Sequence, residues 1–223
     1  MKLPRETPVM TLPNATLFPQ ALLPLYIFEP RYRQMLADAL HSNRVFAVAM
    51  QKPGSSRETP LPIAGLGVIR VSVRHKNDTS HLILQGIARV ELEQTVRYKP
   101  YRVQRIRPLE TPPCDTVAVD ALLAKVRELL RERIELGLPF PPLFSSKMEK
   151  METPPSFSPE ILGYLDSLTD PEQTADLVSC AVLTGSAERQ AILETIDIET
   201  RLRRLIQFLL VEIRKQRKGG THE

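Results

Sequence analysis

The sequence TLFPQALLPLYIFEPRYRQMLADAL, residues 16–40, decides the fold because it combines a strand, a corner and a helix. Residues 25–28 are apolar and bounded by prolines, which predicts a short buried strand. Pro30 suits the first turn of a helix, where its missing N–H would have no partner in any case. Apolar residues then follow at the spacing of one helix face: Tyr32, Met35, Leu36, Ala39 and Leu40. We expect this helix to cover the sheet to which the strand belongs.

The composition is that of an ordinary globular protein. The 223 residues are 42% hydrophobic and 25% charged, with a formal net charge of +4. This length accommodates one large domain or two small ones. The modest positive charge leaves nucleic acid open as a partner without arguing for it, because the clustering of charge matters more than its sum.

Cysteine usage and hydropathy indicate a cytoplasmic protein. Cys114 and Cys180 lie far apart and form no CxxC pair, which argues against a zinc site or a redox motif. The amino-terminal residues contain no apolar segment of the kind found in signal peptides. No apolar run approaches the ~20 residues that a membrane span needs. We therefore expect no membrane association.

The first half of the chain has the pattern of short strands. A strand flanked by Pro8 and Pro13 is expected at a sheet edge. Turn residues at 77–79 predict a hairpin, and Gly86 is expected to interrupt its second strand. Besides 25–28, the predicted strands are 9–12, 44–50, 63–75, 82–96 and 101–109. With one crossing helix, they predict a small, strongly bent sheet or partly closed barrel.

The second half of the chain has helical periodicity. Thr111, Pro112 and Pro113 mark the boundary, so the predicted domains are 1–110 and 111–223. Asp115, Asp170 and Asp197 are predicted to cap helices. We predict a Pro-rich connection at 138–159 and helices at about 115–136, 159–168, 171–183, 187–195 and 198–216. The predicted class is α+β, with a β-rich domain followed by an all-helical bundle.

Several short motifs carry a resemblance to a known family. In order, they are Leu12-Pro13, Phe18-Pro19, Leu23-Pro24-Leu25 and Phe28-Glu29-Pro30-Arg31-Tyr32. This series resembles the opening of the Lon N-terminal domain, the substrate-binding domain of the ATP-dependent Lon proteases, which also occurs alone in short bacterial proteins. Weaker matches extend over most of the chain: Gly86, Arg89, Val90, Tyr98, Tyr101, Ala175, Asp176, Leu177, Leu193, Glu194, Asp197, Arg201 and Leu202. The resemblance implies a PUA-like β domain followed by helices, and a role in substrate recognition.

The chain lacks the motifs of the catalytic modules that Lon proteases carry. It has no GxxxxGK[ST] phosphate-binding loop, and no segment resembles the Ser–Lys peptidase domain. Ser186 lacks the second glycine of a nucleophile elbow and is predicted to cap a helix. His75 and His81 flank the hairpin turn and could approach across strands, but the histidines lack metal-site spacing. We predict no catalytic residue, no metal site and no cofactor.

Two features are candidate peptide-binding surfaces. Glu29 and Arg31, at the corner, could contact a ligand, although a local ion pair or a helix-start carboxylate explains them equally well. Methionine and phenylalanine on an adaptable segment suit loosely specified peptide recognition. In the Pro-rich connection these apolar residues are Phe140, Leu143, Phe144, Met148, Met151 and Phe157. The alternative is that they pack back onto the two halves of the chain.

A third feature is a basic and aromatic strand pair that could stack bases and neutralise phosphates. Its residues are Arg97, Tyr98, Lys99, Tyr101, Arg102, Arg105 and Arg107. The alternative is a solvated outer face with both tyrosines half buried. Our hypothesis is a non-enzymatic protein that holds unfolded or extended polypeptide in an apolar groove, with a sheet edge supplying main-chain hydrogen bonds. A protease or chaperone partner stays open, and nucleic-acid binding is the alternative function.

Overall fold

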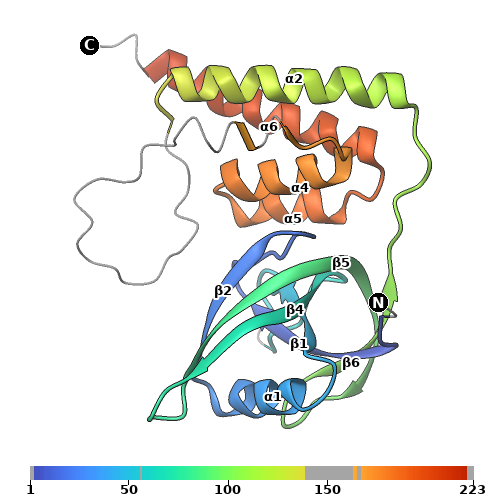
Figure 1. Ribbon diagram of the computed structural model, residues 1–223, viewed down its shortest axis with the longest axis vertical. Helices are drawn as coiled ribbons and strands as arrows, with labels where there is room; N and C mark the ends of the chain where they lie inside the picture. The colour runs from blue at the N-terminus through green and yellow to red at the C-terminus, as the bar shows by residue number, and fades with distance from the viewer. Residues whose placement is uncertain (1–2, 56, 139–162, 165–166, 220–223) are drawn as a thin grey trace. The chain divides into compact units, whose positions relative to one another are not determined.

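The computed structural model describes residues 3–55, 57–138, 163–164 and 167–219. The chain divides into two compact units, Met1–Glu110 and Thr111–Glu223. We call the first the sheet unit, because it contains six strands and helix α1, and the second the helical unit, because it contains helices α2, α4, α5 and α6 (Figure 1). This composition confirms the predicted α+β class.

The sheet of the first unit is mixed and strongly bent. Its strands are β1 (Glu6–Leu12), β2 (Leu22–Ile27), β3 (Val45–Met50), β4 (Ile63–Arg74), β5 (Ser80–Arg97) and β6 (Val103–Pro108). The strand order is β2-β5-β4-β3-β1-β6, and β6 also pairs with β5. Strands β5, β4, β3, β1 and β6 therefore form a partly ring-like sheet, and β2 lies outside it against β5.

The prediction that the first strand lies at an edge was wrong. β1 lies between β3, to which it is parallel, and β6, to which it is antiparallel. The ladder with β3 begins at Val9, one residue beyond Pro8, and Val9 also donates its N–H to Arg102 O at 2.9 Å. Pro8 therefore removes no hydrogen bond from the ladder with β3, and a proline beside an interior strand is tolerated.

The predicted interruption at Gly86 was wrong for the strand itself, because β5 is continuous through this residue, but its pairing with β4 shifts register between Gly86 and Ala88. A Cβ built on Gly86 would lie 2.0 Å from Phe18 O, and one built on Gly65 would lie 1.9 Å from Leu17 O. Leu17 and Phe18 are buried, so this segment passes directly over the sheet. The glycines permit close approach of two backbones and do not end a strand.

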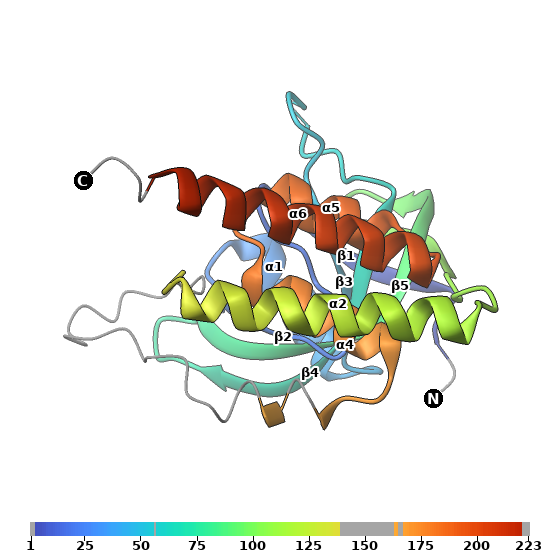
Figure 2. The same ribbon diagram turned by 90° about the horizontal axis from the view of Figure 1, so that it is seen from above.

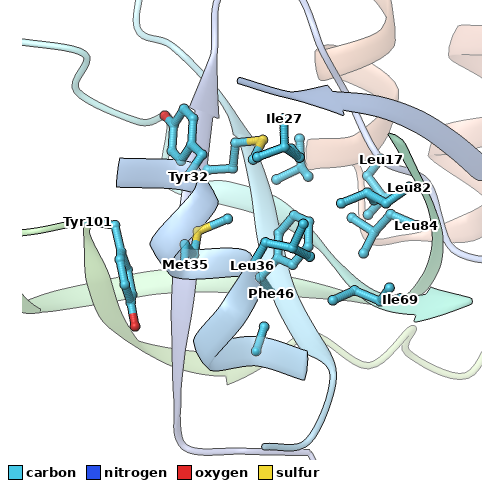
Figure 3. Close-up of a cluster of buried hydrophobic side chains, with 13 residues drawn as sticks. Leu17, Ile27, Tyr32, Met35, Leu36, Phe46, Ile69, Leu82, Leu84 and Tyr101 are labelled. Atoms are coloured by element: carbon cyan, nitrogen blue, oxygen red, sulfur yellow. The ribbon is translucent and has the colours of Figure 1, made fainter. Parts of the chain in front are cut away.

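Helix α1 (Pro30–Leu40) covers the sheet as predicted. Tyr32, Met35, Leu36 and Ala39 are buried on one of its faces. They join a core cluster that includes Phe46 of β3 (Figure 3). The Tyr32 hydroxyl donates to Thr11 O at 3.2 Å, which ties the helix to β1.

Strand β3 is the centre of the sheet unit, because all six of its residues are buried. Phe46 and Val48 belong to the cluster under α1. Val45, Ala47 and Ala49 belong to a second cluster with residues of β1, β4, β5 and β6. Successive side chains of a strand point to opposite faces, so one strand supplies both cores.

The helical unit contains α2 (Thr116–Glu135), α4 (Pro171–Val182), α5 (Ser186–Glu194) and α6 (Ile198–Gly219). As predicted, Asp115, Asp170 and Asp197 accept hydrogen bonds from N–H groups of the first turns, at 3.0, 3.1 and 2.8 Å. Ser186 was wrongly predicted as a cap. Gly185 occupies the cap position in extended conformation, and Ser186 is the first residue of α5.

Of the predicted helix at 159–168, Gly163, Tyr164 and Ser167 are described and helical. Among the described helices, none is both long enough and apolar enough to span a bilayer.

Helices α2 and α6 lie side by side in both views (Figure 1 and Figure 2). A buried arginine joins them. Arg133 of α2 has no exposed side-chain surface and donates two hydrogen bonds to the Glu212 carboxylate of α6, at 2.8 and 3.0 Å. A second buried arginine, Arg201, donates to the carbonyl oxygens of Thr195 and Ile196 at 2.8 and 2.7 Å. Both guanidinium groups therefore stabilise the helical unit from its interior.

A candidate binding face on the sheet unit

The sheet unit extends beyond its ring as a three-stranded arm (Figure 1). The pairing of β3 with β4 ends at Val68, and residues 69–74 of β4 then pair with β5 alone. Strand β2 pairs along the other side of β5, from Leu22 opposite Gln85 to Ile27 opposite Ser80. We define the arm as β2, residues 69–74 of β4 and residues 80–85 of β5.

The two faces of the arm differ in their surroundings. Ile27, Leu82 and Leu84 point into the core cluster under α1, and Leu23 and Leu25 pack against it. Residues directly opposite each other in a ladder share a face. Two rows therefore cross the opposite face, which we call the outer face: Tyr26–His81–Val73 and Pro24–Ile83–Val71.

The outer face is apolar and exposed. Relative exposure is 48% for Tyr26, 47% for Val71 and 52% for Val73. Leu22, on the same side of β2, is 52% exposed, and Phe28, just beyond the strand, is 58% exposed. Phe28 corrects the prediction of a buried strand at 25–28, because the strand ends at Ile27. A contiguous set of large apolar side chains on a surface is a typical sign of a binding site.

Aromatic rings continue the outer face toward the tip of the hairpin. The rings of Tyr26 and Phe28 are stacked with centroids 5.8 Å apart, and the Tyr26 and His81 rings are 4.8 Å apart. His75 Nε2 lies 2.6 Å from His81 Nδ1, which confirms the predicted approach across the strands. Tyr26, His75 and His81, with Lys76, Asn77 and Thr79, line a shallow hollow of about 430 Å³.

The described residues contain no group of three or more His, Cys, Asp or Glu side chains placed to hold a metal ion.

The free edge of β2 borders the outer face. Gly86 N donates to Ala21 O at 2.9 Å, so alternate residues from Ala21 onward direct their main-chain groups to β5. Leu22, Pro24 and Tyr26 direct theirs to the other side, where no described strand pairs with β2. Pro24 contributes a carbonyl but no N–H, which blunts the edge at its middle. The N–H groups of Leu22 and Tyr26 point the same way.

The predicted ligand residues at the corner contact each other. Arg31 Nε donates to Glu29 Oε2 at 2.9 Å, and Arg31 Nη2 donates to Glu58 Oε1 at 2.9 Å. The hydrogen bond from Arg31 lowers the pKa of Glu58, and the same bond raises the pKa of Arg31. Glu58, which the sequence did not single out, thus ties the loop before β4 to the start of α1. A local ion pair, the alternative to ligand contact for Glu29 and Arg31, is therefore present at the corner.

The basic and aromatic strand pair is divided between the core and the surface. Tyr101 is only 5% exposed and donates its hydroxyl to Asp38 Oδ2 at 2.5 Å. Its ring is therefore not available to stack on a base, and the prediction that Tyr101 forms part of a nucleic-acid surface was wrong. Arg107 forms ion pairs with Glu91 and Glu93. Tyr98 is 68% exposed, and the Arg102 guanidinium lies 5.2 Å from its ring centroid.

The remaining predicted peptide-binding residues, Phe140, Leu143, Phe144, Met148, Met151 and Phe157, lie outside the described residues. The outer face was missed because residues 22–28 are apolar at almost every position, a pattern typical of a strand buried on both sides. Val71 and Val73, which alternate with polar neighbours on β4, were the available signal.

A comparison with protein-family models matches residues 6–211 to the substrate-binding domain of ATP-dependent protease La (LON). Among curated proteins, the chain is 24% identical over 214 residues to Lon protease of Dictyoglomus thermophilum, covering 95% of this chain and 25% of that protein. It is 27% identical over 212 residues to Lon protease 2 of Myxococcus xanthus, covering 93% of this chain and 24% of the relative. The chain thus spans about a quarter of the length of these relatives.

Two solved structures share the fold. The N-terminal domain of Mycobacterium avium complex Lon protease matches with a TM-score of 0.65 at 22% identity, covering 92% of this chain and 97% of that one. A Lon N-terminal domain protein from Xanthomonas campestris matches with a TM-score of 0.58 at 16% identity, covering 91% and 97%. At these identities the likeness establishes the fold.

Proposed function

The chain belongs to the family of the substrate-binding domain of ATP-dependent protease La (Lon), and from this premise we propose that it binds unfolded or extended polypeptide on the outer face and free edge of the arm. One observation carries the proposal: exposed apolar side chains of β2 and β4 lie on one face of the arm, beside an edge of β2 with which no described strand pairs. This placement replaces the corner residues Glu29 and Arg31, which contact each other and Glu58.

Recognition would proceed by addition of a strand to the arm. An extended segment beside β2 receives hydrogen bonds from the N–H groups of Leu22 and Tyr26 and donates to the carbonyl groups of the same edge. Every second side chain of that segment then points to the side of the outer face. Main-chain bonding is independent of sequence, and flat apolar contacts are undemanding, so the site favours unfolded chains as a class over one defined motif.

The expected affinity is modest. Burying one large apolar side chain contributes about 1.5–3 kcal/mol. Much of that gain is offset because the segment becomes ordered and loses its translational and rotational freedom. A few such contacts correspond to dissociation constants in the micromolar range. Binding of this strength suits a domain that captures many unfolded chains and releases them.

We further propose that this chain is not itself an enzyme. The family match is to a substrate-binding domain, and the relatives named as Lon proteases are about four times as long. Polypeptide held on the arm would be processed by a separate protease or handled by a chaperone partner. Neither a cofactor nor a metal ion is required for the contacts described.

The test is a titration of the protein with a fluorescently labelled, permanently unfolded protein such as reduced and carboxymethylated α-lactalbumin. Replacing the two stacked rings in the Tyr26→Ser, Phe28→Ser double variant should weaken binding at least about tenfold, equivalent to about 1.4 kcal/mol. Val96→Ser is the matched control, because Val96 is 50% exposed on β5 but lies outside the arm.

Two results would contradict this proposal. The first is an absence of saturable binding up to tens of micromolar protein. The second is equal weakening by Val96→Ser and by the double variant, which would show that binding does not depend on the arm. Circular dichroism of each variant verifies that the fold is retained.

A further inference from the structure

A second hollow lies in the sheet unit, away from the arm. It has a volume of about 580 Å³ and is formed by the loop before β4, the last third of β5, the loop after it and the start of β6. Arg57, Leu92, Tyr98, Arg102 and Gln104 are among the residues that line it. None of them belongs to the arm, so the hollow is a separate surface of the same unit. Its volume lies within the range of small-ligand sites.

The floor of the hollow contains an unsatisfied acceptor. Gln104 is 6% exposed, and its Nε2 donates to Thr95 Oγ1 at 3.1 Å. Its Oε1 is buried and accepts no hydrogen bond from any described residue. Buried polar atoms in native proteins nearly always have partners, and each exception calls for an explanation. A ligand that reaches Gln104 would satisfy this oxygen by presenting a hydrogen-bond donor.

The rim of the hollow is cationic. Arg102 lies with its guanidinium over the Tyr98 ring and donates from Nη2 to the main-chain oxygen of Glu58 at 3.4 Å. The Glu58 carboxylate is bound to Arg31, and Glu93, which also lines the hollow, pairs with Arg107. Within the described part of the chain, neither Arg57 nor Arg102 has a carboxylate within ion-pair distance. Guanidinium groups in such positions bind carboxylates with two parallel hydrogen bonds.

We propose that this hollow binds a short peptide segment that carries a carboxylate. The peptide N–H supplies the donor that Gln104 Oε1 requires, the carboxylate binds Arg57 and Arg102, and Leu92 and the Tyr98 ring provide apolar contact. The phosphates of a nucleic-acid backbone would bind Arg57 and Arg102 equally well, but a phosphodiester has no N–H that could donate to Gln104 Oε1. The site does not depend on peptide binding at the arm, because the two surfaces share no residue.

The probes are three acetylated tripeptides that differ only in charge. Acetyl-Leu-Ala-Asp-amide carries a side-chain carboxylate, acetyl-Leu-Ala-Asn with a free carboxyl terminus carries a terminal one, and acetyl-Leu-Ala-Asn-amide carries none. Chemical-shift titration of the full chain should give binding at least about tenfold tighter for one acidic peptide than for the neutral one. The preferred acidic peptide identifies the source of the carboxylate.

Variants locate the binding. Arg57→Gln and Arg102→Gln should each weaken the acidic peptide about tenfold and leave the neutral peptide unchanged. Gln104→Leu should weaken both peptides, because it removes the acceptor. Arg5→Gln is the control, since Arg5 is an exposed arginine of the same unit that does not line the hollow. The Tyr26→Ser, Phe28→Ser variant should bind the acidic peptide normally, so this test can fail or succeed independently of the arm.

Three outcomes would overturn the proposal. They are no saturable binding of any tripeptide, equal binding of the acidic and neutral peptides, and loss of binding in Arg5→Gln to the same extent as in Arg102→Gln. A decathymidylate probe is titrated in parallel. Saturable binding of that probe alone, abolished by Arg102→Gln and falling steeply with salt, would assign the hollow to phosphate and refute the peptide.

Discussion

Single glycines allow the amino-terminal segment to lie directly on the sheet. A Cβ on Gly65 or Gly86 would meet the main-chain oxygen of Leu17 or Phe18 at 1.9 or 2.0 Å, closer than any non-bonded contact. A backbone cannot move aside as a flexible side chain does, so replacement by alanine at either position must shift the segment or the strand. These two residues hold the Leu-Phe-Pro segment in its buried position.

At the corner, the Arg31–Glu58 pair makes stability depend on pH. The hydrogen bond from Arg31 lowers the folded-state pKa of Glu58 from its ordinary value of 4.5. The pair therefore contributes its full stability above about pH 4.5, and the contribution disappears as pH falls through the lowered pKa. Both side chains are about a third or more exposed, so the effect should stay below about 1 kcal/mol.

We expect Glu58→Gln to lose less stability than the unchanged protein between pH 7 and pH 3, measured by urea unfolding at each pH. Asp78→Asn is the control, because the Arg74–Asp78 pair at the hairpin tip is more exposed than the Arg31–Glu58 pair. It should lose as much stability as the unchanged protein. An acid loss of the same size in Glu58→Gln would show that Glu58 has no part in the pH dependence.

At the scale of elements, the two longest described helices are joined by a buried charge. Arg133 is fully buried in α2, whereas its partner Glu212 in α6 is 32% exposed. Removing one partner of such a pair leaves a charge in a poorly solvated place, which costs more than the intact pair contributes. Arg133 also donates from Nη1 to Leu138 O at 3.2 Å.

We therefore expect Glu212→Ala to lower the free energy of unfolding by about 2–3 kcal/mol, somewhat less than for a fully buried pair. Glu128→Ala is the matched control, because Glu128 pairs with Lys125 on the exposed side of α2. The control should change stability by less than about 0.5 kcal/mol. Denaturant titrations followed by circular dichroism measure both, and equal effects would refute the assigned role of Arg133.

Helices with a long periodic pattern were predicted correctly. Predictions that rested on a single proline or glycine failed, because each of these residues is compatible with two different local structures. The stripe of α1 and the three aspartate caps were readable because they depend on neighbours within one or two turns. The interior position of β1 could not be predicted, because the sequence does not show that the ladder with β3 begins only at Val9, one residue after Pro8. The continuity of β5 through Gly86 was hidden because the segment that requires the glycine lies almost 70 residues earlier.

At the scale of the whole molecule, each of the two units has an apolar core of its own. The clusters under α1 and inside the ring contain residues of the sheet unit only. In the helical unit, apolar residues of α2, α4, α5 and α6 are buried, among them Val126, Val178, Ile192 and Leu205. We expect the units to unfold in separate transitions, because domains with separate cores depart from two-state behaviour.

Differential scanning calorimetry tests this expectation with two variants, one in each unit. Gly86→Ala should lower the temperature of one transition, and Glu212→Ala should lower that of the other. Gly163→Ala, where a Cβ meets nothing within 4 Å, controls for the substitution itself. A single transition lowered equally by the first two variants would show that the chain unfolds as one cooperative unit.

The candidate site was predicted less well than the fold. The expectation of a polypeptide-binding surface with a usable sheet edge came from the family motifs and the missing catalytic ones. Its placement at Glu29 and Arg31 stays a prediction, and the sequence did not reveal that Arg31 pairs with Glu58 of the loop before β4. Of the second hollow, the sequence singled out Tyr98 and Arg102 as part of the basic and aromatic strand pair, but it did not reveal Gln104, because an isolated glutamine in a strand says nothing of its partners.

The class of the fold, the first helix with its buried face, the helix caps and the family could be predicted from the sequence, because each depends on local spacing or on ordered motifs. The neighbours of each strand, the apolar residues exposed on the outer face and the unsatisfied polar atoms among the described residues became known only from the three-dimensional arrangement. The physical reason is that burial and hydrogen bonding at these positions depend on residues far away along the chain. Tyr26 meets His81, Gly86 meets Phe18 and Arg31 meets Glu58 only after the sheet has closed.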